Sequence, residues 1–102
     1  TLAIQKLEKE WDYVAATGFF ARLRYESIFD ETGFQRVKNI LTSIEIAEDE
    51  TFDKRLVEVT WFIPVFMFWQ REAWVQDGIN VKRLDEGINI LSDALTGVLG
   101  LP

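Results

Sequence analysis

The sequence predicts an all-α fold, either a four-helix antiparallel bundle or a close variant. Apolar residues recur at helical spacing along almost the whole chain. Two segments begin with a capping residue flanked by apolar residues at the spacing of a hydrophobic staple. The predicted connections are short, which favours antiparallel neighbours. We expect residues 1–102 to form a single helical domain.

The first helical segment contains a glycine in its middle. Its apolar spacing, 3-4-3 over Ile4, Leu7, Trp11 and Val14, continues through Gly18 to residue 28. An interior glycine costs about 1 kcal/mol relative to alanine. The segment is therefore expected to form either one long helix with a weak point at Gly18 or two helices broken there.

The second helix is expected to run from about Glu31 to Glu48. Asp30 precedes it as an N-cap, with Phe29 before the cap and Phe34 four residues into the helix, as in a hydrophobic staple. The acidic residues that follow would form its end and the next loop. Its buried side is expected to hold Phe34, Val37, Leu41 and Ile44.

The third helix contains an uncharged aromatic run from Val59 to Trp69. The run has 11 residues, whereas a helix that crosses a membrane needs roughly 20. Pro64 lacks a backbone N–H donor, so we expect it to kink or interrupt the helix near Thr60–Ile63. A helix from about Thr51 would bury one stripe, formed by Leu56, Thr60, Ile63, Met67 and Trp74.

The same run can also be read as a strand. Val57, Val59, Trp61 and Ile63 then alternate along it, and their β-branched and aromatic side chains suit a strand. We prefer the helix, because the residues on either side are helix-like and no partner strand is evident.

The last helix follows a turn predicted at Asp77 and Gly78. Asn80 is its candidate N-cap, again with a staple, here between Ile79 and Leu84. Gly97 and Gly100 suit its C-terminal end. Its apolar seam is the most regular in the chain and consists of Val81, Leu84, Ile88, Leu91, Leu95 and Val98.

The composition removes most routes to catalysis and metal binding. The chain has no histidine and no cysteine, so the commonest general base and the usual zinc ligands are missing. No glycine-rich phosphate loop and no activated serine pattern is present. We therefore expect a non-catalytic protein without a metal site or a cofactor. The absence of cysteine suits a reducing compartment, and the expected location is cytoplasmic.

The net charge of −6 is concentrated in one stretch. Glu45, Glu48, Asp49, Glu50 and Asp53 lie within nine residues, so 12 of the 17 acidic residues remain against 11 basic ones elsewhere. This balance argues against nucleic-acid binding, and the acidic flank argues against a membrane surface. A concentrated negative patch would favour a basic protein partner. The alternative is a solvated loop before the next helix.

The aromatic run is the second candidate for a partner-facing surface. It has more tryptophan and phenylalanine than one face of one helix can hide, and these residues are favoured at interfaces. The alternative is that all of them lie in the core. The candidate partner-binding residues are Glu45, Glu48, Asp49, Glu50, Asp53, Trp61, Phe62, Phe66, Trp69 and Trp74. Separately, Arg22 and Glu26 have the spacing of an ion pair on a helix surface.

The middle of the chain has a distinctive order of features. A helix with the pattern Asn39-Ile-Leu-Thr-Ser-Ile-Glu45 precedes a short acidic turn and an aromatic-rich helix that ends in Arg71. This layout over residues 36–71 resembles a helical domain of unknown function found in bacterial and phage proteins. The resemblance implies a helix over residues 52–75, a bacterial or phage origin and no catalytic residues.

These observations favour a small, acidic protein-interaction or oligomerisation module that binds a protein partner or itself. Two alternatives remain open. One is an inhibitor or immunity protein that neutralises a basic toxin or nuclease through the acidic patch. The other is a membrane-associated regulatory module.

Overall fold

Helices make up all of the regular secondary structure in residues 2–12, 14, 15, 17–44 and 54–99, the part of the chain that the computed structural model describes. The all-α prediction is confirmed for these residues. The helices are α1 (Leu2–Glu10), α2 (Phe19–Tyr25), α3 (Glu31–Ser43), α4 (Lys54–Gln76) and α5 (Lys82–Leu99).

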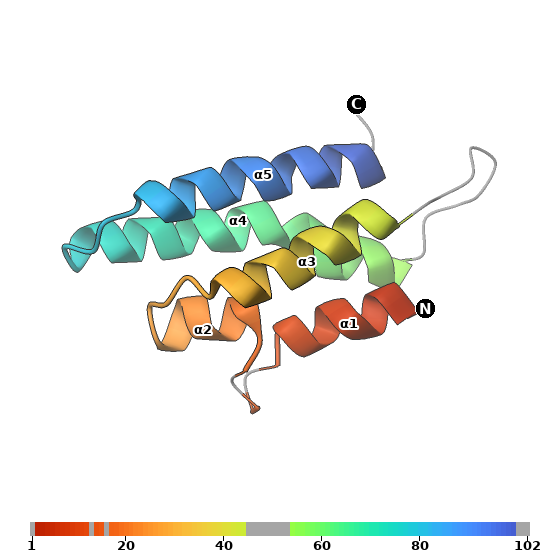
Figure 1. Cartoon of the computed structure of the whole chain (residues 1–102), viewed down its shortest axis with the longest axis horizontal. Coiled ribbons are helices and arrows are strands. Elements are labelled where there is room, and N and C mark those ends of the chain that lie inside the picture. Colours follow the sequence, from red (N-terminus) through yellow and green to blue (C-terminus); the bar gives the residue numbers. More distant parts are fainter. Residues whose placement is uncertain (1, 13, 16, 45–53, 100–102) are drawn as a thin grey trace.

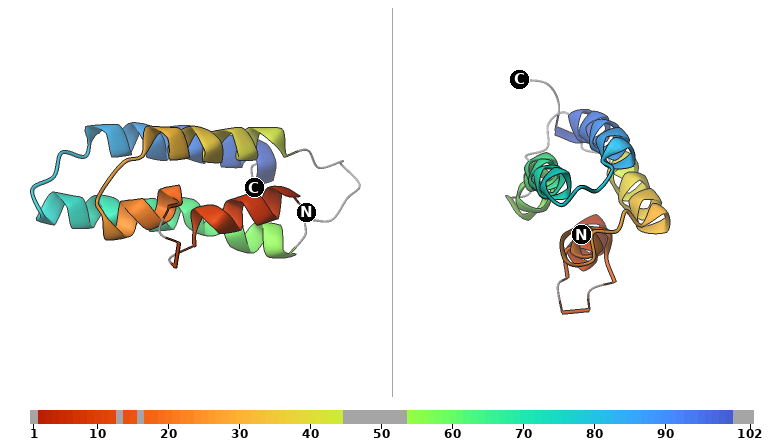
Figure 2. Two further views of the ribbon diagram at one scale, coloured as in Figure 1. Left: turned by 60° about the horizontal axis from the view of Figure 1, so that its bottom comes forward. Right: turned by 90° about the vertical axis from the view of Figure 1, so that its left-hand side faces the viewer.

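The helices lie lengthwise along the longest dimension of the molecule, which measures 47 Å (Figure 1). α1 and α2 run in one direction, and α3, α4 and α5 then alternate. In the end-on view of Figure 2, α1, α3, α5 and α4 surround a common centre, and packing contacts join each helix to the next around this circuit. The residues at the centre include Leu7, Phe19, Phe20, Leu23, Phe34, Val37, Leu41, Ile63, Phe66, Met67, Leu84 and Leu91, all of them buried.

The first helical segment is broken into two helices, one of the two predicted outcomes. α1 ends at Glu10 and α2 begins at Phe19, so the break covers the whole connection and not Gly18 alone. The chain returns so closely past α1 that a Cβ atom on Gly18 would lie 2.4 Å from the carbonyl oxygen of Glu10. Only glycine fits here without moving the backbone. Trp11 stacks on Phe20 beside this crossing, with 4.0 Å between the ring centroids.

α3 begins where predicted and ends earlier. Asp30 precedes its first residue, and the rings of Phe29 and Phe34 lie 5.1 Å apart, as the staple spacing predicted. The prediction that the helix continues to Glu48 is wrong, because Ile44 already has extended backbone angles (φ −76°, ψ 123°). A run of acidic residues is unfavourable at the negative C-terminal end of a helix, which accounts for the earlier stop.

α4 is one continuous helix of 23 residues with Pro64 inside it. The strand interpretation is therefore wrong, and the helix is not interrupted at the proline. Pro64 offers no N–H to the carbonyl of Thr60. The buried Thr60 hydroxyl donates to the carbonyl of Leu56, 2.7 Å away. The predicted buried stripe is confirmed at Leu56, Thr60, Ile63, Met67 and Trp74.

The turn predicted at Asp77 and Gly78 is confirmed. Gly78 has φ +75°, and two bonds close the end of α4, from the Ile79 N–H to the Trp74 carbonyl at 2.8 Å and from the Gly78 N–H to the Val75 carbonyl at 3.1 Å. This pairing is a Schellman motif, which glycine favours.

α5 begins at Lys82, one residue later than a cap at Asn80 predicts, and buries most of the predicted seam. The Asn80 side-chain oxygen accepts a hydrogen bond from the N–H of Lys82, the first residue of α5, at 2.8 Å. Gly97 lies inside the helix, whereas Gly100 is outside the described residues. Leu84, Leu91, Leu95 and Val98 are buried, and Val81 and Ile88 are partly buried against them.

Candidate functional site

The outward side of α4 carries a cluster of exposed aromatic side chains. Trp61 is 53% exposed, Phe68 54% and Trp69 56%. Phe62 lies beside them and is partly buried. We call Trp61, Phe62, Phe68 and Trp69 the α4 patch. The largest contiguous apolar patch on a protein surface is often a functional contact site.

The sequence of α4 produces this patch because the helix is apolar on all sides. Its buried stripe faces the core, so the apolar residues opposite that stripe face outward. Phe62 links the exposed rings, since its centroid lies 5.5 Å from that of Trp61 and 5.3 Å from that of Trp69. Trp61, Phe62 and Trp69 thus form one packed cluster of rings.

The aromatic residues predicted to bind a partner lie in two different environments, some on the surface and some in the core. Trp61, Phe62 and Trp69 belong to the α4 patch, whereas Phe66 (2% exposed) and Trp74 (5% exposed) lie in the core. Phe68 was missed as a candidate, although its position two helical turns after Trp61 indicates the same face. The acidic candidates Glu45, Glu48, Asp49, Glu50 and Asp53 lie outside the described residues.

Arginine ion pairs flank α4 near both of its ends. Arg55 lies 3.3 Å from Glu8 of α1 and 3.2 Å from Glu58. Arg71 donates to Asp85 of α5 at 2.6 Å. Hydrogen bonds to Glu8 and to Asp85 raise the pKa of Arg55 and of Arg71, respectively. The aromatic patch therefore lies between polar groups, the arrangement of a typical protein interface.

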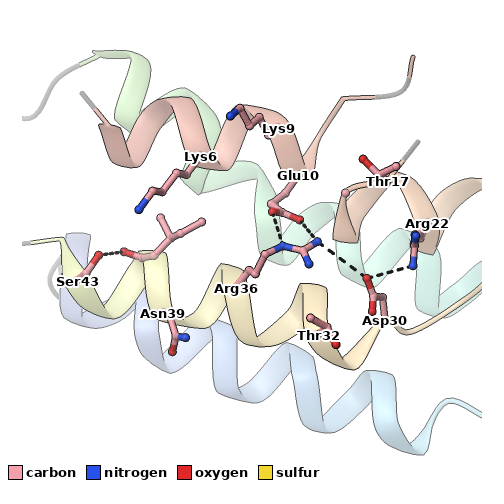
Figure 3. A pocket seen from close by; sticks show the side chains of 12 residues that line it. Lys6, Lys9, Glu10, Thr17, Arg22, Asp30, Thr32, Arg36, Asn39 and Ser43 are labelled. Atoms are coloured by element: carbon pink, nitrogen blue, oxygen red, sulfur yellow. Dashed lines mark hydrogen bonds and ion pairs between the residues drawn. The ribbon is translucent and has the colours of Figure 1, made fainter. Parts of the chain in front are cut away.

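A second surface, which the sequence analysis missed, is a groove between α1 and α3 (Figure 3). Its volume is about 1000 Å³. α3 contributes Thr32, Arg36, Asn39 and Ser43, whose spacings of four, three and four residues place them on one helical face. The side chains and backbone of Lys6, Lys9, Glu10, Thr17, Gly18, Arg22, Asp30, Thr32, Arg36, Asn39, Ile40 and Ser43 line the groove.

A buried carboxylate forms one wall of this groove. Glu10 is only 6% exposed, and it accepts two hydrogen bonds from Arg36, from Nε at 3.1 Å and from Nη2 at 3.0 Å. It also accepts the N–H of Phe19, the first residue of α2, at 2.9 Å. These bonds compensate the burial of a charge, and the hydrogen bonds that Arg36 donates to Glu10 raise the pKa of Arg36.

Arg22 and Asp30 form the end of the groove near α2. Arg22 donates to Asp30 at 3.3 Å, and this contact takes the place of the predicted pair with Glu26. The Oδ2 atom of Asp30 is also 4.0 Å from Nη2 of Arg36. The Nε atom of Arg22 is buried and has no hydrogen-bond partner among the described residues.

Searches of the structure and comparisons with other proteins add three findings. Among residues 2–44 and 54–99, apart from 13 and 16, no cluster of acidic residues has the makings of a metal site. No helix in the described part of the chain is long and apolar enough to cross a membrane. No protein family, characterised protein or solved structure matches the chain.

Proposed function

We propose that this chain is a non-catalytic oligomerisation module that binds a second copy of itself through the α4 patch. The observation that carries the proposal is the exposure of Trp61, Phe68 and Trp69, each more than half exposed on one helix. We further propose that the supporting frame is a four-helix antiparallel bundle. In this frame α1 and α2 share one corner, and α4 bends at Pro64.

The size of the patch supports a contact of this kind. A fully buried aromatic side chain covers on the order of 150–250 Å², so three half-exposed rings present roughly 250–400 Å² of apolar surface. This is the range of the largest apolar patch on a typical monomer, which is often functional. Tryptophan also dominates binding energy at interfaces, because it loses little conformational freedom on burial.

The charges on α4 suit pairing with a second copy. Lys54 and Glu72 lie on the same helical face as Trp61 and are each nine residues from Ile63. In an antiparallel pair of α4 helices centred at the level of Ile63, Lys54 of one copy would lie opposite Glu72 of the other. Trp61 would lie opposite Val65. Two-fold symmetry makes each contact occur twice, as in the commonest class of homodimer.

A charge reversal and its rescue test this arrangement. We expect the mass of the wild type, measured by light scattering over a concentration series, to rise above 11.9 kDa towards twice that value. Lys54→Glu should weaken association about tenfold, because it breaks two symmetric pairs worth up to about 1 kcal/mol each. Lys54→Glu combined with Glu72→Lys should restore it, since both pairs are rebuilt with the charges exchanged.

Two further variants complete the test. Trp61→Gln with Trp69→Gln should give a monomer, because it removes the apolar anchors. Lys82→Glu makes the same charge change on the exposed surface of α5 and should leave the mass unchanged. A wild type that stays at 11.9 kDa up to about 1 mM, where even weak contacts form, would overturn the proposal.

A further inference from the structure

The groove between α1 and α3 has the opposite charge to the protein as a whole. The chain carries a net charge of −6, yet the groove is lined by four cationic side chains, Lys6, Lys9, Arg22 and Arg36, and two carboxylates, Glu10 and Asp30. A concave surface concentrates the field of the charges that line it. The groove is therefore a local positive site on an acidic protein.

Both carboxylates of the groove already accept hydrogen bonds from groups of the protein. Glu10 accepts hydrogen bonds from Arg36 and from the N–H of Phe19, and Asp30 accepts one from Arg22. No ion pair to Lys6 or Lys9 is found among the described residues. Both lysines line the groove and are exposed, so their ammonium groups are available to an added anion.

α3 supplies neutral polar groups at the rim of the groove. Thr32 and Asn39 line the groove and are exposed, and Figure 3 shows Lys6 extending from α1 towards the end of α3 that carries Ser43. Ile40 is the one aliphatic residue in the lining. The charged and polar side chains of the lining therefore favour a polar ligand. It can be larger than a single inorganic ion, because about 1000 Å³ is the size of a site for an organic molecule.

We infer that the groove binds a small organic polyanion. Lys6 and Lys9 neutralise its acidic groups, and Asn39 and Thr32 provide hydrogen bonds. Ligands of this class carry two or more carboxylate or phosphoryl groups. Arg36 and Arg22 form the wall of the site and hold it in shape, since their guanidinium groups are bonded to Glu10 and Asp30.

Calorimetry with defined anions tests this inference on the full chain. The probes are citrate, which carries carboxylates, and pyrophosphate, which carries phosphoryl groups. We expect one of them to bind the wild type at a single saturable site. Lys6→Gln with Lys9→Gln should weaken that binding about tenfold or more, because each lost charge-assisted hydrogen bond is worth a factor of this order. Asn39→Ala should weaken it about threefold, as expected for one neutral hydrogen bond.

A matched control distinguishes anion binding in the groove from nonspecific attraction by the surface charge of the protein. Lys38→Gln with Lys82→Gln removes the same two charges from positions that line neither the groove nor the α4 patch, and it should leave binding unchanged. Binding of citrate alone would identify a carboxylate ligand, and binding of pyrophosphate alone a phosphoryl ligand. The inference is overturned if neither probe saturates the wild type below about 10 mM, or if the control weakens binding as much as Lys6→Gln with Lys9→Gln.

One more probe excludes a macromolecular occupant. A short poly-glutamate peptide carries the same carboxylates on an extended chain. If the peptide binds more tightly than both small anions, the groove is a docking site for an acidic protein segment, and the small-molecule assignment is wrong. Since Lys6 and Lys9 are exposed, their replacement leaves the core intact, and an unchanged helical circular dichroism spectrum checks this.

Discussion

At the scale of single residues, the fold depends on the close approach of Gly18 to the last turn of α1. An added Cβ atom would meet the carbonyl oxygen of Glu10 at 2.4 Å and its Cα at 2.5 Å. These are backbone atoms, so they cannot rotate away as the end of a side chain can.

We expect Gly18→Ala to lower the free energy of unfolding by about 2 kcal/mol, the typical cost of overpacking a tight contact. Urea denaturation monitored by circular dichroism measures the change. Gly97→Ala is the matched control, because Gly97 is helical and nothing lies near its added Cβ. It should raise stability by roughly 0.5–1 kcal/mol. Equal effects of the two substitutions would contradict this account of Gly18.

Glu31 gives a second residue-scale prediction, in this case of pH dependence. It accepts two hydrogen bonds from Arg83, at 2.7 and 2.8 Å, and these bonds lower its pKa from the ordinary value of 4.5. A folded-state pKa below the unfolded one means that the stabilisation is present above pH 4.5 and is lost as the pH falls through the folded-state pKa.

We expect Glu31→Gln to destabilise the protein by about 0.5 kcal/mol at neutral pH, a small value because the pair is exposed. The difference from the wild type should disappear at a second, acidic pH at which Glu31 is protonated. Urea denaturation at the two pH values provides the measurement. In an Arg83→Gln background, Glu31→Gln should have no effect at either pH, and a persisting difference would assign it to another interaction.

At the scale of elements, the connections that follow α2 and α4 each contain one residue with a positive φ angle, a serine in the first and a glycine in the second. The connection after α2 places Ser27 at φ +53°, whereas the connection after α4 places Gly78 at φ +75°. The left-handed region costs a residue with a Cβ atom about 1 kcal/mol or more, and glycine avoids this cost.

Ser27→Gly should therefore raise stability by about 0.5–1 kcal/mol, and Gly78→Ala should lower it by about 1 kcal/mol. Thermal unfolding of both variants provides the test. Nothing lies within 4 Å of a Cβ added to Gly78, so crowding does not contribute to the second change. The two substitutions should change the stability in opposite directions. A destabilising Ser27→Gly would show that the serine side chain matters more than the backbone angle.

Element positions were predictable where local periodicity decided them. The buried stripe of α4 and the seam of α5 follow from residue spacing, because one helical face meets the core, and the turn at Gly78 follows from the Asp77-Gly78 dipeptide. The connection between α1 and α2 was only one of two predicted outcomes. It depends on Glu10, which looks like a surface acid in the sequence and becomes buried only when α2 and α3 supply its partners. Nothing in the sequence near Glu10 indicates that residues of α2 and α3 will compensate the burial of its charge.

At the scale of the whole molecule, one arginine–carboxylate pair spans each of the four contacts between neighbouring helices around the centre. Three of the pairs lie largely at the surface and add little stability, whereas the fourth contains the buried Glu10. All four specify which helical faces meet, because a different arrangement would separate the charges or place like charges together. The pairs are Arg36–Glu10 between α3 and α1, Arg83–Glu31 between α5 and α3, Arg71–Asp85 between α4 and α5, and Arg55–Glu8 between α4 and α1.

The two candidate surfaces differ in how far the sequence reveals them. The α4 patch was predictable in kind, because a helix that is apolar on all sides cannot bury every ring. Which rings stay exposed depends on tertiary packing, since Phe66 is covered by the rings of Trp11 and Phe20. Trp74 is buried in the core. The groove was not predictable, since its lysines come from α1 and other polar residues from α3. Only tertiary packing brings these positions together.

The placement of the four tryptophans gives the chain two separate optical reporters. Trp61 and Trp69 are solvated on the α4 patch, so water relaxes around their excited indoles and shifts their fluorescence to long wavelength. The indole nitrogens of Trp11 and Trp74 are buried without a hydrogen-bond partner among the described residues, which keeps the emission of these two rings at short wavelength. Covering α4 would move the first pair to the blue, and unfolding would move the second to the red. Association and denaturation therefore leave opposite spectral signatures in the unlabelled protein.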